Sequence, residues 1–131
     1  MVTRRLAREL ALQALYSAEI GHRDTGEVLD EVLGRKRDAD RAFVKDLVYG
    51  TIENAPQSDE VIAPLLEGWT LDRLPTIDRL LLRMGIFELQ HRPLTPKPVV
   101  INEAVELAKK FSTEASGRFV NGVLSKASGL P

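Results

Sequence analysis

TIDRLLLRMGIFELQ, residues 76–90, is the stretch that decides the fold, because a helix wound from it is apolar on almost every side. Only Arg79, Arg83 and Gln90 gather into a narrow polar stripe. A helix that is hydrophobic nearly all round belongs inside a bundle, and a stretch of about 15 residues with several charges is too short to span a bilayer. We therefore predict a central helix covered by other helices, with Gly85 allowing one neighbour to approach closely.

Composition limits the classes of function that fit the chain. Its 131 residues predict one domain with a sizeable core. The formal net charge of −1 means that any nucleic-acid site is a local basic patch. The absence of cysteine excludes disulfides, thiol catalysis and thiolate metal sites. With no signal-peptide pattern and no membrane span, we expect a soluble, cytoplasmic protein.

Hydrophobic periodicity outside the central stretch predicts six further helices and no strand. The fold class expected is therefore all-α: a single globular helical bundle of about seven helices, residues 1–131, in two subdomains at about 1–54 and 58–131. Pro56 marks the seam between the subdomains, at residues 54–57. The additional helices are expected at about 3–20, 24–33, 38–54, 58–68, 99–111 and 112–127.

Several single residues carry structural expectations of their own. Ser58 or Asp59 should cap the fourth helix, and Pro64 should kink it. Trp69, the only tryptophan, should plug an edge of the core. Gly122 should allow a second close helix contact, and Ile52, Phe111 and Phe119 should face inward.

Three arginines occupy the first turns of the first helix, where the helix dipole disfavours cations. They are Arg4, Arg5 and Arg8, and they suggest an anionic partner. The alternative, a solvated polar face, stays open on charge patterning alone. Tyr16 lies two turns beyond Arg8, close to the same side, and the alternative is that it rims the core.

The sequence contains no recognisable motif for metal binding, nucleotide binding or catalysis. His22 and His91 lie in predicted turns without a second ligand at metal-binding spacing, so no metal site is expected. Neither G-x-x-x-x-G-K-[ST] nor G-x-G-x-x-G is present, so no nucleotide cofactor is expected. Most carboxylates have a nearby Lys or Arg at helix-face spacing, which indicates solvated ion pairs. The residues therefore predict a binding protein rather than an enzyme.

Four stretches in order resemble the NusB family of bacterial transcription antitermination factors. They are RRLARELALQALY (4–16), DRLLLRMGIFEL (78–89), VVINEAVELAKKF (99–111) and RFVNGVLSKA (118–127), and the resemblance covers the whole chain. It implies an all-helical fold of two halves with three to four helices each. It also implies binding of single-stranded boxA RNA from ribosomal-operon leaders, together with ribosomal protein S-ten acting as NusE, within a transcription elongation complex that holds other Nus factors.

The resemblance also implies roles for individual residues. RNA contacts are expected at the arginine-rich start and at the turn between the last two helices: Arg4, Arg5, Arg8, Phe111, Ser112, Ala115 and Arg118. Contacts with NusE are expected at Tyr16, Asp72 and Asp78, although the dipole argument alone makes Asp78 an anion at a helix start.

Two alternative functions remain open at this point. NusB-like domains also stand at the front of RNA cytosine methyltransferases, but we expect this chain not to be such an enzyme, because it ends at Pro131 without room for a cofactor-binding sheet. The other alternative is a helical scaffold that forms homodimers without RNA.

Overall fold

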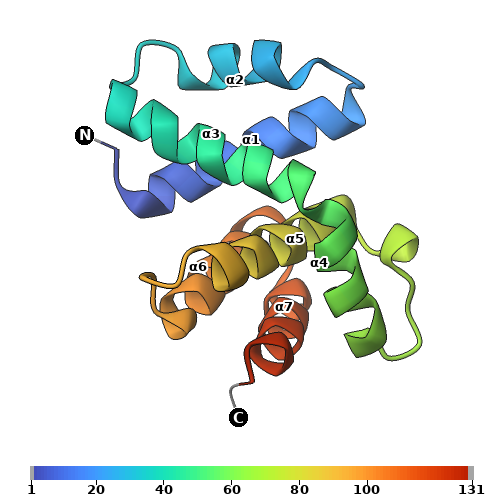
Figure 1. Cartoon of the computed structure of the whole chain (residues 1–131). Coiled ribbons are helices and arrows are strands. Elements are labelled where there is room, and N and C mark those ends of the chain that lie inside the picture. Colours follow the sequence, from blue (N-terminus) through green and yellow to red (C-terminus); the bar gives the residue numbers. More distant parts are fainter. Residues whose placement is uncertain (1, 130–131) are drawn as a thin grey trace. The chain divides into compact units, whose positions relative to one another are not determined.

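The computed structural model describes residues 2–129, apart from the side chain of Ala39. Within this range the chain forms seven α-helices and two short 3-10 helices and contains no strand, which confirms the all-α prediction (Figure 1). No helix in this range is both long enough and apolar enough to cross a membrane. The elements are α1 Arg4–Ile20, α2 Thr25–Leu33, α3 Asp38–Glu53, α4 Ala55–Ile62, η1 Ala63–Leu65, η2 Leu71–Arg73, α5 Thr76–His91, α6 Lys97–Phe111 and α7 Glu114–Ser128.

The chain divides into two compact units, Met1–Ile52 (unit 1) and Glu53–Pro131 (unit 2). The division falls just before residues 54–57, where the sequence led us to expect a seam.

Unit 1 is built on α1, which starts where Thr3 supplies a cap: the Thr3 hydroxyl accepts a hydrogen bond from the Leu6 backbone N–H at 3.0 Å. The apolar face of α1 is buried as its spacing predicts, and α1 packs against α2. The core residues that α2 and α3 contribute are fully buried: Val28, Leu29, Leu33, Val44, Leu47 and Val48.

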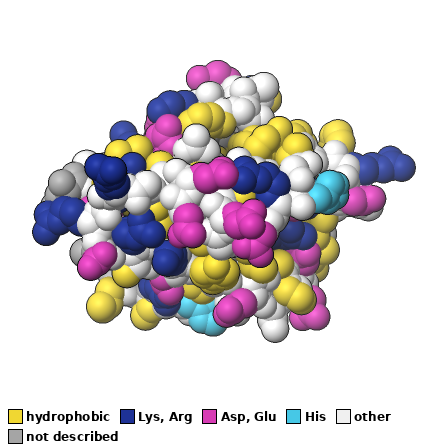
Figure 2. Space-filling view, turned by 90° about the horizontal axis from the view of Figure 1, so that it is seen from above, with side chains coloured by type: hydrophobic (Ala, Val, Ile, Leu, Met, Phe, Trp, Pro, Cys, Tyr) yellow, Lys and Arg dark blue, Asp and Glu magenta, His cyan; other side chains and the backbone are white. Residues whose placement is uncertain are grey.

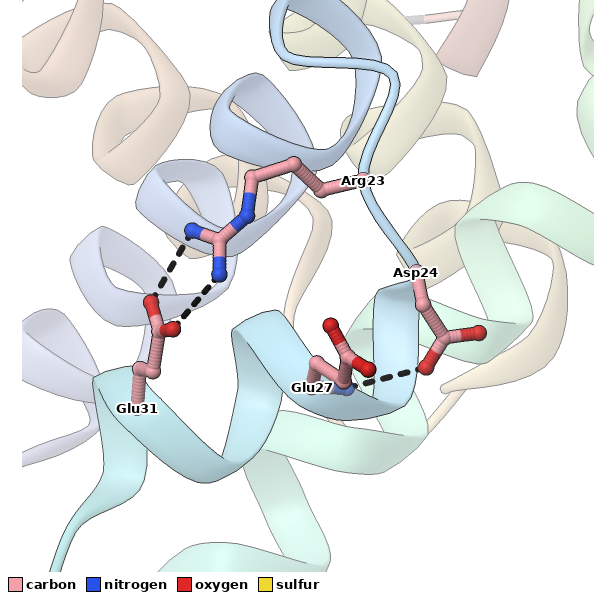
Figure 3. A network of polar contacts seen from close by, with 4 residues as sticks. All are labelled: Arg23, Asp24, Glu27 and Glu31. Atoms are coloured by element: carbon pink, nitrogen blue, oxygen red, sulfur yellow. Dashed lines mark hydrogen bonds and ion pairs between the residues drawn. The ribbon is translucent and has the colours of Figure 1, made fainter.

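The connection between α1 and α2 is held by two polar contacts, drawn in Figure 3. Arg23 and Glu31 form a two-fold contact with N–O distances of 2.9 and 2.5 Å. Asp24 caps α2 by accepting a hydrogen bond from the Glu27 backbone N–H at 3.0 Å, as the sequence predicts. The hydrogen bond from Arg23 lowers the pKa of Glu31, so this carboxylate stays charged to a lower pH than usual.

Unit 2 is organised around α5, which lies among α4, α6 and α7 (yellow among green, orange and red in Figure 1). Nine residues of α5 are buried, which confirms the predicted central helix: Asp78, Leu80, Leu81, Leu82, Met84, Gly85, Ile86, Phe87 and Glu88. A Cβ atom at Gly85 would lie 2.8 Å from Leu124 Cδ1 of α7. The close helix approach predicted at this glycine is therefore present.

The start of unit 2 corrects two expectations about prolines. α4 begins at Ala55, not at a cap formed by Ser58 or Asp59, because Pro56 fits the first turn of a helix, where no backbone N–H is needed. Pro64 does not kink a longer helix. The α-helix ends at Ile62, and the chain continues through Pro64 as the 3-10 helix η1.

Trp69 does not plug the core, because its side chain is 57% exposed. Leu66 takes the buried position at the end of η1, and Gly68, with φ of 77°, then turns the chain. The exposed Trp69 follows directly after this turn.

Other expectations about inward-facing residues are also wrong. Ile52 and Phe111, both in the last turn of their helices, are exposed. A Cβ at Gly122 would meet no atom within 4 Å, so no helix approaches there. α6 starts at Lys97, two residues earlier than expected, since Pro98 is tolerated in its first turn.

Candidate functional site

The predicted site residues are divided between the two units. Unit 1 carries Arg4, Arg5, Arg8 and Tyr16, and unit 2 carries Asp72, Asp78, Phe111, Ser112, Ala115 and Arg118. Among the described residues no group of His, Asp and Glu side chains has the arrangement of a metal site. Each of the two sets is built within its own unit.

The arginines of unit 1 differ from one another in exposure. Arg4 lies with its guanidinium 3.8 Å from the centroid of the Phe43 ring on α3, and the Arg8 guanidinium lies 5.8 Å from the same ring. Arg4 and Arg5 are exposed, whereas Arg8 is only 5% exposed. A ligand approaching the start of α1 therefore meets Arg4 and Arg5, and Phe43 helps to orient Arg4 by a cation–π contact.

The sequence did not predict the role of Phe43. Phe43 lies four residues before the buried Leu47 on α3, the spacing of a core residue, yet its ring is the surface on which Arg4 stacks. On the face drawn in Figure 2, Lys and Arg side chains are interspersed with Asp, Glu and hydrophobic ones. This mixture agrees with the small net charge and with basic sites that are local.

The turn between α6 and α7 is tied together by three hydroxyl groups. Thr113 caps α7 by accepting a hydrogen bond from the Ser116 backbone N–H at 2.9 Å. The Ser116 hydroxyl donates its single proton to Asp78 Oδ2 at 3.0 Å. The Ser112 hydroxyl, 2.8 Å from Ser116 Oγ, must then be the donor of that pair. These bonds join the turn to the first turn of α5.

Asp78 is therefore not on the protein surface, where a partner-facing residue was expected, because its side chain is only 4% exposed. Its Oδ2 is bound by Ser116, but its Oδ1 has no hydrogen-bond partner among the described residues. Asp78 belongs to the lining of a pocket of about 220 Å³, together with Ala115, Trp69 and Phe119. The pocket brings together Asp78, assigned to a protein partner, and Ala115, assigned to RNA.

The other residues at this end of unit 2 are exposed. Phe111 closes α6, and the Lys110 ammonium lies 5.3 Å from the centroid of its ring. Arg118 stands on the outer face of α7 and lines a second hollow, of about 250 Å³, with Trp69 and Gly122. Sequence reasoning missed Trp69 and Phe119 as site residues, because helical spacing and size made both look like core.

Asp72 lies in η2 and is exposed. Hydrogen bonds from the Thr70 side chain and from its own backbone N–H lower the pKa of Asp72. Asp72 therefore presents a carboxylate that stays charged to a lower pH than usual. Tyr16 of unit 1 is also exposed.

Comparison with known proteins agrees with this architecture over nearly the whole chain. The profile of the NusB family matches residues 5–128. The transcription antitermination protein NusB of Halalkalibacterium halodurans is 43% identical over 125 residues, covering 95% of this chain and 92% of that protein.

Two solved structures are similar in fold as well as in sequence. T. maritima NusB superposes with a TM-score of 0.92 at 34% identity, covering 98% of this chain and 92% of that one. A crystal structure of the antitermination factors NusB and NusE in complex with dsRNA gives a TM-score of 0.87 at 31% identity, with 96% of each chain covered. The shared helices, the family match and the sequence identity together establish that this chain belongs to the NusB family.

Proposed function

We propose that this protein is a transcription antitermination factor that binds boxA-type single-stranded RNA of ribosomal-operon leaders, together with ribosomal protein S-ten acting as NusE. The observation that carries the proposal is the match over nearly the full length to curated antitermination proteins. A similar chain has also been crystallised with NusE and RNA. The protein then acts by binding within the cytoplasm, in an elongation complex with other Nus factors, and not by catalysis.

The start of α1 supplies electrostatic contacts to the RNA. Arg4 and Arg5 are exposed at a helix start where nearby acidic residues are absent from the first turn. Their guanidinium groups meet phosphates, while the buried Arg8 beside Phe43 keeps the cluster in place. Arginine is suited to this role because its planar fork matches phosphate oxygens.

The α6–α7 turn supplies the contacts that depend on base identity. Phe111 offers an exposed ring for stacking, and Arg118 a cation beside it on α7. Ser112 and Ala115 shape the turn, which the Ser116–Asp78 hydrogen bond holds against α5. RNA loops and single strands are recognised in this way, by unstacked bases lying on aromatic or arginine planes.

NusE contacts the exposed residues Tyr16 and Asp72 in this proposal. Asp78 reaches a partner only through the pocket, where Oδ1 accepts a hydrogen bond from a donor group that enters it. A buried carboxylate oxygen without a partner is costly, so such a donor would be bound favourably.

The test measures binding of labelled boxA RNA and of a scrambled RNA of equal length, each with and without purified NusE. We expect tighter binding to boxA than to the scrambled RNA, and a further gain when NusE is added. A transcription assay on a template with a terminator behind boxA should then show increased read-through that depends on this protein. Equal affinity for both RNAs, with no effect of NusE, contradicts the proposal.

A further inference from the structure

A shallow groove runs along the outer face of α7 in unit 2. Arg118, Gly122 and Lys126 follow one another at intervals of four residues, so they lie on one side of the helix. A side chain is missing at Gly122, and a Cβ there would meet no atom within 4 Å. The groove, of about 250 Å³, therefore has an open notch in the middle and a cation at each end.

The wall opposite α7 is formed by Trp69 and Leu65. The indole of Trp69 is 57% exposed, which is unusual for the largest apolar side chain, and it borders both this groove and the pocket beside Asp78. Its backbone N–H donates to the Leu66 carbonyl at 3.4 Å, directly after the turn at Gly68. A large aromatic ring held at the surface beside cations is a platform on which nucleic-acid bases stack.

The spacing of the two cations along α7 suits contacts with the phosphates of a single RNA strand. Arg118 and Lys126 are eight residues apart, or about 12 Å along the helix axis at 1.5 Å per residue. Glu67 pairs with Lys126 at 3.2 Å, but both side chains are largely exposed, at 86% and 55%. An exposed ion pair contributes little, so a phosphate can replace Glu67 at Lys126.

We propose that this groove is an additional RNA subsite, in which one base stacks on Trp69 over the notch at Gly122 and the neighbouring phosphates lie at Arg118 and Lys126. The inference rests on the RNA binding proposed above and extends it from the α6–α7 turn along α7, since Arg118 belongs to both. RNA fits this groove better than a protein partner does, because both ends of the groove carry a cation.

Trp69 provides the readout, because it is the only tryptophan in the chain and its fluorescence reports on this groove and on the adjoining pocket beside Asp78. Titration of the full-length protein with boxA RNA extended by several nucleotides at either end should quench this fluorescence. Trp69→Ala should weaken binding of the extended RNA about tenfold, the effect of losing one stacked base, while Trp69→Phe should retain most of the affinity.

Two charge variants separate RNA binding from a structural role. Lys126→Gln and Glu67→Gln both remove the same ion pair, so their effects on thermal unfolding should have the same sign. Their effects on RNA affinity should be opposite. Lys126→Gln should bind RNA more weakly than the parent protein does, and Glu67→Gln should bind it more tightly. Lys45→Gln, an exposed site on α3 of unit 1, is the control for the loss of one positive charge elsewhere.

Gly122→Leu fills the notch at an exposed helix position and should weaken RNA binding without lowering stability. If boxA RNA binds but leaves the Trp69 fluorescence unchanged and these variants bind normally, the subsite is wrong and the proposed function stands. Quenching by NusE and not by RNA assigns the groove to the protein partner and also overturns the inference. If no RNA binds under any condition, the proposed function fails as well.

Discussion

At the scale of single residues, the three arginines at the start of α1 are not equivalent. All three have the same charge and lie within two turns, so the sequence alone gives no reason to expect different roles for them. In the folded unit Arg4 stacks on Phe43, Arg5 is exposed and Arg8 is buried. Their roles should therefore separate in experiments that distinguish electrostatic binding from stability.

Arg5→Ala should reduce the slope of log affinity against log salt concentration by about 0.7, because one phosphate contact with a single strand is lost. Its melting temperature should stay close to that of the parent protein. Arg8→Ala should instead lower the melting temperature, since it removes a buried side chain packed near Phe43. RNA titrations at several salt concentrations, with thermal unfolding of both variants, test this difference. A reduced slope for Arg8→Ala at unchanged stability would assign the phosphate contact to Arg8.

Asp78 gives the second prediction at this scale. Asp78→Lys should lower the free energy of unfolding by about 3 kcal/mol, because it places an unpaired charge in a buried site and removes the acceptor of the Ser116 hydroxyl. Asp78→Asn keeps an acceptor oxygen for Ser116 and should cost about 1 kcal/mol. Chemical denaturation measures both values. Equal stability of the lysine variant and the parent would mean that the carboxylate is exposed in solution.

At the scale of elements, α5 determines how unit 2 is packed. It is buried on most sides and packs against α4, α6 and α7. Arg83 belongs to its narrow polar stripe and forms a two-fold ion pair with Asp59 of α4, with both N–O distances at 2.8 Å. We therefore expect no long face of α5 to tolerate substitution without a loss of stability.

Leu81→Ala on α5 should cost about 2–5 kcal/mol of unfolding free energy, the range for truncating a fully buried leucine. Urea denaturation of the two proteins gives the difference. A loss below about 0.5 kcal/mol, as at surface sites, would place α5 at the edge of the bundle.

Two glycines in helices of unit 2 form a matched pair. Gly85→Ala should destabilise the protein by about 1–3 kcal/mol, because its Cβ would lie 2.8 Å from the fully buried Leu124 side chain. Gly122→Ala should stabilise it by up to about 1 kcal/mol, since alanine favours the helix and the space is open. The comparison requires only thermal or urea unfolding of both variants. A stabilising Gly85→Ala would show that α7 does not approach α5 closely.

At the scale of the whole molecule, the small net charge limits how RNA binding depends on salt. The proposed phosphate contacts are Arg4, Arg5, Arg118 and Lys126, which predict a slope of log affinity against log salt of about −3 for a single strand. Fluorescence anisotropy with boxA RNA at several salt concentrations measures it. A slope two or three times steeper would require a broad basic surface, which the interspersed charges in Figure 2 do not provide on the face drawn there.

Self-association is a separate property of the whole molecule and stays a prediction from the family resemblance alone. Sedimentation of the free protein, and of the protein with RNA and NusE, measures it directly. This measurement also tests the alternative of a dimerising scaffold without RNA.

The features of this protein that depend only on residues close together in the chain were determined by the sequence alone. The helix caps at Thr3, Asp24 and Thr113 are local, since each side chain accepts a hydrogen bond from the backbone N–H three residues ahead, and the all-round apolar character of α5 is local as well. The four stretches that resemble the NusB family indicated membership of it, which the family match confirms. The assignment of individual residues to RNA or NusE remains a prediction.

The surfaces were decided only by the tertiary structure, because they depend on residues far apart in sequence. Ser116 reaches Asp78 across 38 positions, and Phe43 stacks under Arg4 from another helix. Trp69 has the size and apolarity of a core residue, yet the turn at Gly68 leaves it exposed. Helical periodicity states which face of a helix is apolar, but the angle at which helices pack decides which of those residues are covered.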